Sequence, residues 1–219
     1  MLKKVVIFDN GFGGELFADY LEEEVPVMEV IRVIDWRNSD KILRSPKEAR
    51  KVAMAALRPY IGKVDLIVFA NYLISVTSLK YFQRKFKKQK FVGFTLRKPN
   101  KAKAQRALIL TTSALHKTLN YHIFVKQMRL KIKTVDCDEW VELVDDGELT
   151  EQMIYKRLVE VKEFRPNVIM LGCTQFVDIK SSLVKIFGPT TAIDDQYGVM
   201  TKKVCKVIGL RGLDGKRYK

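Results

Sequence analysis

Short runs of consecutive apolar residues recur along the chain and alternate with longer amphipathic stretches. The runs Val-Val-Ile-Phe at 5–8, Leu-Ile-Val-Phe at 66–69 and Val-Ile-Met-Leu at 168–171 are apolar at every position. Runs of this length and composition are typical of parallel strands that are buried on both faces of a sheet. The pattern predicts eight strands, at residues 4–9, 30–35, 66–70, 91–94, 107–111, 131–135, 168–172 and 191–194.

The stretches between these runs carry helical patterns, most clearly at residues 45–60, 76–87 and 149–164. Ser45-Pro46-Lys47-Glu48 is a good helix start, because serine caps, proline suits the first helical position and glutamate suits the third. Strands that alternate with helices in this way predict an α/β fold with mainly parallel sheets.

The predicted strands repeat at a constant spacing of 102 residues along the chain. Four coincidences at one spacing indicate an internal duplication, so we expect two Rossmann-like, three-layer α/β/α domains related by pseudo-twofold symmetry. Ligands of open parallel sheets bind outside the carboxyl ends of the strands, so residues 9–11, 71–72, 111–112 and 173–174 would line a cleft between the domains. The aligned pairs are Val5 and Ala107, Val33 and Val135, Leu66 and Val168, and Phe91 and Ile193.

Composition excludes several classes of protein. Hydrophobic residues make up 47% and charged residues 30% of the 219 residues, so the chain is not of the disordered type. No apolar run approaches the ~18 residues of a membrane span, and the N-terminus does not have the pattern of a signal peptide. The cysteines Cys137, Cys173 and Cys205 are odd in number and lack metal-ligand spacing. We therefore expect a cytoplasmic protein with no membrane association and no metal site.

The net charge of +15 is concentrated in one part of the chain. Residues 66–135 hold 16 Lys and Arg and no Asp or Glu, and the densest part runs from Lys80 to Arg106. Such a segment attracts anions, so it could bind nucleic acid or an acidic partner. The alternative is the solvated face of a basic helix followed by a basic loop, and no RNP, zinc-knuckle or helix-turn-helix pattern accompanies the charge.

Two predicted strand ends carry a family signature. Residues 9–14 read Asp-Asn-Gly-Phe-Gly-Gly and residues 172–177 read Gly-Cys-Thr-Gln-Phe-Val. They resemble the Asp-Ser-Gly-x-Gly-Gly and Gly-Cys-Thr-His-Tyr-Pro signatures of the aspartate/glutamate racemase superfamily, most closely those of glutamate racemase. Residues 111–121, 137–147 and 193–195 resemble further motifs of that family in the same order along the chain.

The resemblance implies the architecture and a cofactor-independent chemistry. The last helix of the family returns to the first domain, which implies one domain at 1–96 plus 188–219 and another at 97–187, with 97–104 as the crossover. Family members are commonly dimers, which implies a homodimer. Their ligands are small carboxylates or amino acids, and no cofactor takes part. Two cysteines face each other across the α-carbon, one removing a proton and the other delivering one.

At several positions that align with the family's catalytic and binding residues, this chain has a different residue. Asn71 replaces the first cysteine and cannot exchange a proton at neutral pH. Tyr72 and Leu73 replace the Asn and Thr that hold the substrate carboxylate, and Asn10 replaces a binding Ser. The resemblance then implies that the chain does not racemise glutamate. It assigns Cys173, Asp9 and Asp145 to catalysis, and to ligand binding it assigns Asn10, Gly11, Asn71, Tyr72, Thr112, Thr174 and Gln175.

Several alternatives remain open at this stage. Cys173 is either a reactive thiol near a helix N-terminus or a small residue packed under the cleft, and Asp9 either contacts a ligand or caps the turn at Gly11–Gly14. The chain is then a non-racemising member of the family, or a decarboxylase or isomerase that uses Cys173 alone, as the related arylmalonate decarboxylases use one cysteine. Anion or nucleic-acid binding at residues 80–106 is a third function, of a different class.

Overall fold

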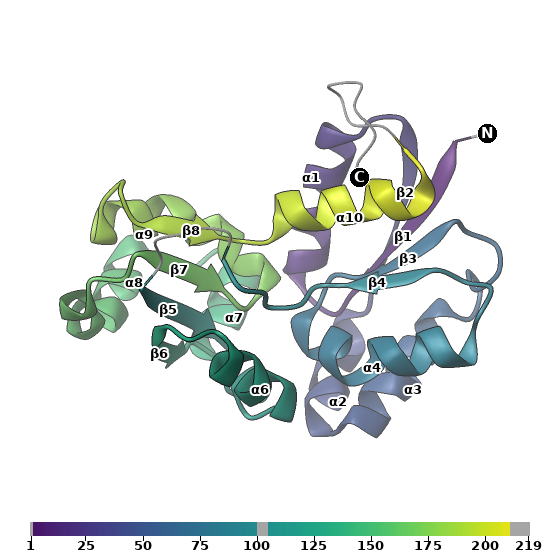
Figure 1. Cartoon of the computed structure of the whole chain (residues 1–219). Coiled ribbons are helices and arrows are strands. Elements are labelled where there is room, and N and C mark those ends of the chain that lie inside the picture. The colour runs from purple at the N-terminus through teal and green to yellow at the C-terminus, as the bar shows by residue number, and fades with distance from the viewer. Residues whose placement is uncertain (1, 100–104, 211–219) are drawn as a thin grey trace. The chain divides into compact units, whose positions relative to one another are not determined.

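Two parallel sheets form the frame of the molecule, and every strand that the apolar runs predict is present (Figure 1). The computed structural model describes residues 2–99 and 105–210. The first sheet has the order β2-β1-β3-β4 and the second the order β6-β5-β7-β8. The strands are β1 (Lys3–Asp9), β2 (Met28–Ile34), β3 (Leu66–Phe69), β4 (Phe91–Gly93), β5 (Arg106–Thr111), β6 (Lys131–Asp136), β7 (Val168–Leu171) and β8 (Ala192–Asp194).

The pairing registers of the two sheets repeat at the spacing found in the sequence. Val5 pairs with Leu66 in the first sheet, and Ala107 pairs with Val168 in the second. The outer pairs follow the same rule, because Ile67 pairs with Phe91 and Ile169 with Ile193. Strand order and register are thus the same in both sheets, and the α/β fold with parallel sheets is confirmed.

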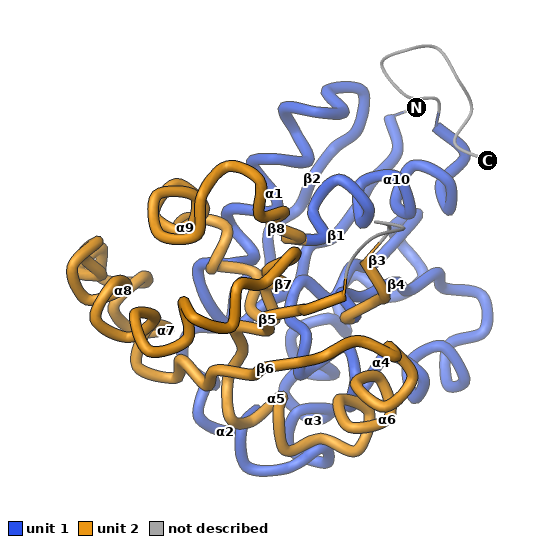
Figure 2. The backbone as a smooth tube through the Cα atoms, turned by 60° about the vertical axis from the view of Figure 1, so that its left-hand side comes forward, with its two compact units in different colours: residues 1–95, 196–219 blue, residues 96–195 orange. Residues whose placement is uncertain are grey.

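The chain divides into two compact units, coloured separately in Figure 2. Of the described residues, unit 1 holds 2–95 and 196–210, and unit 2 holds 96–99 and 105–195. Residues 188–195, expected with the first domain, lie in unit 2 because β8 pairs with β7. Of the expected crossover at 97–104, residues 100–104 lie outside the described residues.

Helices cover both faces of the sheet of unit 1. Figure 1 shows α1 (Phe12–Glu24) and α10 (Tyr197–Ile208) on one face, and α2 (Ser39–Arg44), α3 (Pro46–Leu57) and α4 (Tyr72–Lys85) on the other. Phe8 and Phe69 pack with Phe82 in the core beneath α3 and α4. An aromatic cluster of Phe17, Phe94 and Tyr197 joins α1 to α10. The three-layer arrangement buries both faces at the centre of the sheet, which explains the apolar runs at residues 5–8 of β1 and 66–69 of β3.

Local sequence decides where several helices begin and end. The Oγ of Ser45 accepts a hydrogen bond from the backbone N–H of Glu48 at 3.2 Å, so the predicted cap of α3 is confirmed. Helix α4 begins at Tyr72, four residues before the expected start, because Asn71 caps it. The helix expected at 149–164 is instead α8 (Glu151–Leu158) followed by a 3₁₀ segment (Val159–Phe164), which ends at Arg165 with a φ of 49°.

The remaining helices of unit 2 are short. They are α5 (Ser113–His116), α6 (Leu119–Gln127), α7 (Glu139–Asp145) and α9 (Lys180–Phe187), and a 3₁₀ segment (Thr174–Ile179) follows β7. None of the helices in residues 2–99 and 105–210 has the length and apolar character that a membrane crossing requires.

Candidate functional site

In unit 1, the predicted site residues gather where β1 and β3 end. Asp9 is the last residue of β1 and only 2% of it is exposed. Its Oδ1 accepts a hydrogen bond from the backbone N–H of Asn10 at 2.7 Å, which supports its role in shaping the turn. Gly11, with extended backbone, is the N-cap of α1. Gly14 allows the start of α1 to pack closely against the end of β1, because a Cβ at position 14 would lie 2.4 Å from the Cβ of Asp9.

The two asparagines at this edge are hydrogen-bonded to each other. The Nδ2 of Asn71 donates to the Oδ1 of Asn10 at 2.9 Å. The Oδ1 of Asn71 accepts from the backbone N–H of Ile74 at the same distance, and this bond caps α4. Both ends of the Asn71 amide are therefore used in holding the local structure. The adjacent Tyr72 is buried, and its ring packs edge-on against Phe94.

We expect Asn71→Ala to lower the free energy of unfolding by about 1 kcal/mol, because it removes the cap of α4. Asn71→Asp keeps a capping oxygen and should recover most of that loss. Chemical denaturation of the two variants and the wild type measures both values. Equal stability of Asn71→Ala and wild type would contradict the capping role.

In unit 2, Cys173 stands at the position that corresponds to Asn71. It follows β7 as Asn71 follows β3, and the register places the two 102 residues apart. Their backbones also agree, with φ and ψ of −132° and 135° at Cys173 and −114° and 129° at Asn71. Cys173 precedes a 3₁₀ segment, and its side chain makes no cap bond. The same backbone position thus carries a capping amide in one unit and a thiol in the other.

Gln175 links Cys173 to Asp145. The Sγ of Cys173 donates to the Oε1 of Gln175 at 3.5 Å. The Nε2 of Gln175 donates to the carbonyl of Val141 at 2.7 Å and to the Oδ1 of Asp145 at 3.1 Å. A carbonyl and a carboxylate can only accept, so they fix the NH₂ group on their side and turn the amide oxygen toward the sulfur. Gln175 is buried, which holds this orientation.

The other two thiols have a different environment. Cys137 and Cys205 are fully buried, whereas Cys173 is partly exposed. Burial raises the pKa of Cys137 to about 12, and it also raises the pKa of Cys205. A buried thiol with a raised pKa is a poor nucleophile and a poor proton donor at neutral pH. Of the three cysteines, Cys173 is the one that is not buried.

Threonines complete the edge of the second sheet. Thr112 follows β5 and caps α5, since its Oγ1 accepts from the backbone N–H of Leu115 at 3.4 Å. Thr174 follows Cys173 and is buried. Gly172 leaves room for the neighbouring strand, because a Cβ there would lie 2.8 Å from the Oγ1 of Thr111 and 3.0 Å from the carbonyl oxygen of Leu110.

The structure therefore brings the predicted residues together as two groups, each within one unit. Asp9, Asn10 and Asn71 form the first group, and Cys173, Gln175 and Asp145 form the second. The carbonyl of Val141, which orients Gln175, was not among the predicted residues. No sequence signal marks it, because every residue has a backbone carbonyl.

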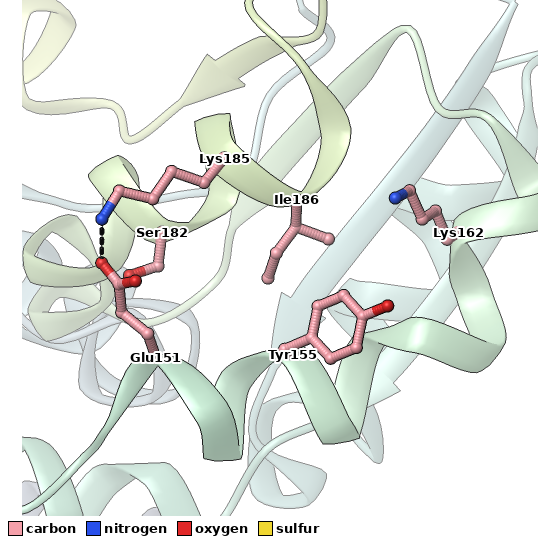
Figure 3. A pocket seen from close by; sticks show the side chains of 6 residues that line it. All are labelled: Glu151, Tyr155, Lys162, Ser182, Lys185 and Ile186. Atoms are coloured by element: carbon pink, nitrogen blue, oxygen red, sulfur yellow. Dashed lines mark hydrogen bonds and ion pairs between the residues drawn. The ribbon is translucent and has the colours of Figure 1, made fainter.

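Two hollows on unit 2 lie away from these groups. One of about 150 Å³ is lined by Tyr155 and Ile186, beside an ion pair of Glu151 with Lys185 (Figure 3). Another, of about 440 Å³, includes Arg106 and lies at the amino end of β5. No residue predicted for catalysis or for binding a small ligand lines either hollow, and Arg106 is the last residue of the predicted basic segment at 80–106. Across residues 2–99 and 105–210, no three His, Cys, Asp or Glu side chains are grouped so as to hold a metal ion.

Comparisons with known proteins give a consistent result. No family model matches the chain. It is 27% identical over 202 residues to the glutamate racemase of Aquifex aeolicus (strain VF5), which covers 87% of this chain and 78% of the relative. It is 24% identical over 221 residues to the glutamate racemase of Roseiflexus sp. (strain RS-1), which covers 96% of this chain and 81% of the relative.

Solved structures share the fold. The crystal structure of Escherichia coli glutamate racemase in complex with L-glutamate and the activator UDP-MurNAc-Ala has a TM-score of 0.85 at 20% identity, covering 99% of this chain and 86% of that one. The aspartate racemase of Picrophilus torridus has a TM-score of 0.65 at 15% identity, covering 99% and 98%. Similarity at these identities shows a common fold.

Proposed function

We infer the function of this chain from its place in the aspartate/glutamate racemase superfamily, to which its sequence and fold assign it. We propose that it does not racemise glutamate, and that Cys173 acts alone as a proton donor to one face of a small carboxylic acid. The reaction class is then a decarboxylation or a one-sided isomerisation. The proton transfer itself needs no cofactor.

The first support comes from Asn71. Racemisation by two bases requires a group on each side of the α-carbon that can take or give a proton. An amide does neither at neutral pH. The hydrogen bonds of Asn71 to Asn10 and to the N–H of Ile74 engage both ends of its amide. Asn71 is thus suited to hold the start of α4 and unsuited to exchange a proton with a substrate.

The observation that carries the proposal is the orientation of Gln175. Its amide oxygen faces the sulfur of Cys173 at 3.5 Å, and its NH₂ group is held by Val141 and Asp145. A thiol can donate a hydrogen bond to this oxygen, whereas a thiolate can only accept one. The oxygen therefore stabilises the thiol form of Cys173 relative to the thiolate. The arrangement therefore favours Cys173 as a proton donor. Asp145 acts as a positioning residue, because it contacts Gln175.

A thiol held in this form suits the protonation of a carbanion. In a decarboxylation, the bond between the α-carbon and one carboxylate breaks, carbon dioxide leaves, and the electron pair stays on the α-carbon. The S–H proton of Cys173 moves to that carbon, and the resulting thiolate regains a proton from water. We assign binding of the remaining carboxylate to the hydroxyl of Thr112, which follows β5, the strand next to β7.

The test is turnover of a panel of small dicarboxylates, including substituted malonates and maleate, in deuterated water. NMR follows the α-carbon of each product, and chiral chromatography gives its configuration. We expect at least one substrate to give a product with one new deuterium and a single configuration. A racemic product, or no turnover across the panel, would overturn the proposed chemistry.

A further inference from the structure

A group of cations lies in the sequence at and after the end of α4, the helix that Figure 1 shows next to α3 in unit 1. All members are exposed, and they come from the last two turns of the helix and the turn that follows it. Among the described residues, no carboxylate forms an ion pair with any of them. We call this group the basic surface, and it consists of Lys80, Arg84, Lys85, Lys87 and Lys88.

The positive charge continues onto α3. Arg50 of α3 donates from Nη2 to the carbonyl oxygen of Thr77 in α4 at 2.9 Å, so the two helices are joined beside the basic surface. Glu48 is the one carboxylate in these two helices. A hydrogen bond from Lys51, with further nearby cations, holds the pKa of Glu48 below its ordinary value. The region therefore has a strong excess of positive charge with little internal compensation.

Stabilisation of the helix end does not account for this group. Cations in the last turn of a helix interact favourably with its dipole, and this explains Arg84 and Lys85. Lys87 and Lys88 lie beyond the helix, and Lys80 lies a turn before its end. Lys80 and Arg84 are four residues apart, so they share one face of α4 with a rise of about 6 Å between them. Two single charges at this spacing suit contacts to neighbouring phosphates.

The aromatic and amide groups of this surface are already engaged. The ring of Tyr81 has the guanidinium of Arg50 at 5.3 Å and the ammonium of Lys85 at 5.5 Å from its centroid. The Nε2 of Gln83 donates to the carbonyl of Phe91 at 3.0 Å. Stacking of unpaired bases requires a free aromatic face, and reading of base edges requires a free polar side chain. The surface thus offers cations for contacts to phosphates, while the ring of Tyr81 and the NH₂ group of Gln83 are taken up within the unit.

We propose that the basic surface binds the phosphate backbone of duplex nucleic acid without sequence preference. This inference is independent of the chemistry at Cys173, since the two sets of residues lie in different units. Phosphate contacts provide most of the affinity in binding of this kind, and they make it depend steeply on salt.

The test uses the full chain, two fluorescein-labelled 20-base-pair DNA duplexes of unrelated sequence, and fluorescence anisotropy between 50 and 300 mM salt. We expect both duplexes to bind alike, with log K falling against log salt by about 0.9 for each phosphate contacted. The double variant Arg84→Glu/Lys88→Glu should bind at least about tenfold more weakly at 50 mM salt, with a slope shallower by about 2.

A matched control separates the surface from the net charge. Lys126→Glu/Lys156→Glu changes the charge by the same amount at exposed positions of unit 2, and we expect it to bind within about twofold of wild type. Circular dichroism checks that both variants are folded. Equal weakening by the two double variants, or a flat salt dependence, would overturn the proposal. Stronger competition by poly-glutamate than by unlabelled duplex would also overturn it, in favour of an acidic protein partner.

Discussion

Replacement of Cys173 by alanine should lower kcat/KM by at least about 10²-fold on any carboxylate that the chain turns over. The expected size follows from the contribution of a positioned general acid, which is typically 10²- to 10⁴-fold. Cys173 is partly exposed and caps no helix, so Cys173→Ala should leave the stability close to that of wild type. Steady-state kinetics and chemical denaturation of the same preparations measure the two quantities.

Two further variants control this result. Cys173→Ser keeps the shape of the side chain but offers a much weaker acid, so it should lose activity to a similar extent. Gln175→Ala keeps the thiol and removes the oxygen that faces it, so it should retain part of the activity with an altered pH profile. Activity that survives in both Cys173 variants would contradict the role of this thiol as the proton donor.

Replacement of Gly172 by alanine should give a large loss of stability. An added Cβ would lie 2.8 Å from the Oγ1 and 2.9 Å from the Cβ of Thr111, and 3.0 Å from the carbonyl oxygen of Leu110. Both neighbours belong to β5, which is paired on either side and cannot move away freely. Overpacking of this kind costs about 1–3 kcal/mol in the free energy of unfolding.

Gly198→Ala is the matched control for that substitution. Gly198 lies in the first turn of α10, and the nearest described side-chain atom to an added Cβ would be the hydroxyl of Tyr20, at 3.7 Å. We expect a change of at most a few tenths of a kcal/mol, or a small gain from the reduced freedom of the unfolded chain. Chemical denaturation compares the two variants. A Gly172→Ala variant as stable as Gly198→Ala would contradict the packing described between β5 and β7.

The sheets could be predicted well from the sequence for a physical reason. Strands buried on both faces need apolar residues at every position. The apolar runs therefore predict where the strands lie, and their constant spacing predicts the internal repeat. The boundary expected at residue 188 rests on the family resemblance and is wrong for residues 188–195, although the repeat aligns Ile193 with Phe91. Its position depends on the pairing of β8 with β7, and such pairing is a contact between distant segments.

The sequence predicted which residues lie at the candidate site, but it did not predict the hydrogen bonds between them. The positions of Cys173 and Asn71 at strand ends follow from the apolar runs before them. The bond between Asn10 and Asn71 joins residues 61 positions apart, and Gln175 is oriented by the carbonyl of Val141, 34 positions away. These contacts depend on how segments meet in the folded units. For Asn71, its preference for helix N-caps was a usable local signal.

Exchange of the α-proton of glutamate tests the central claim most directly. The protein is incubated with L-glutamate and, separately, with D-glutamate in deuterated water, and NMR follows the α-proton while chiral chromatography follows the configuration. With Asn71 in place of a second base and the amide oxygen of Gln175 facing Cys173, we expect both enantiomers to keep their α-proton and their configuration. Interconversion of the two enantiomers that disappears in Cys173→Ala would contradict the account.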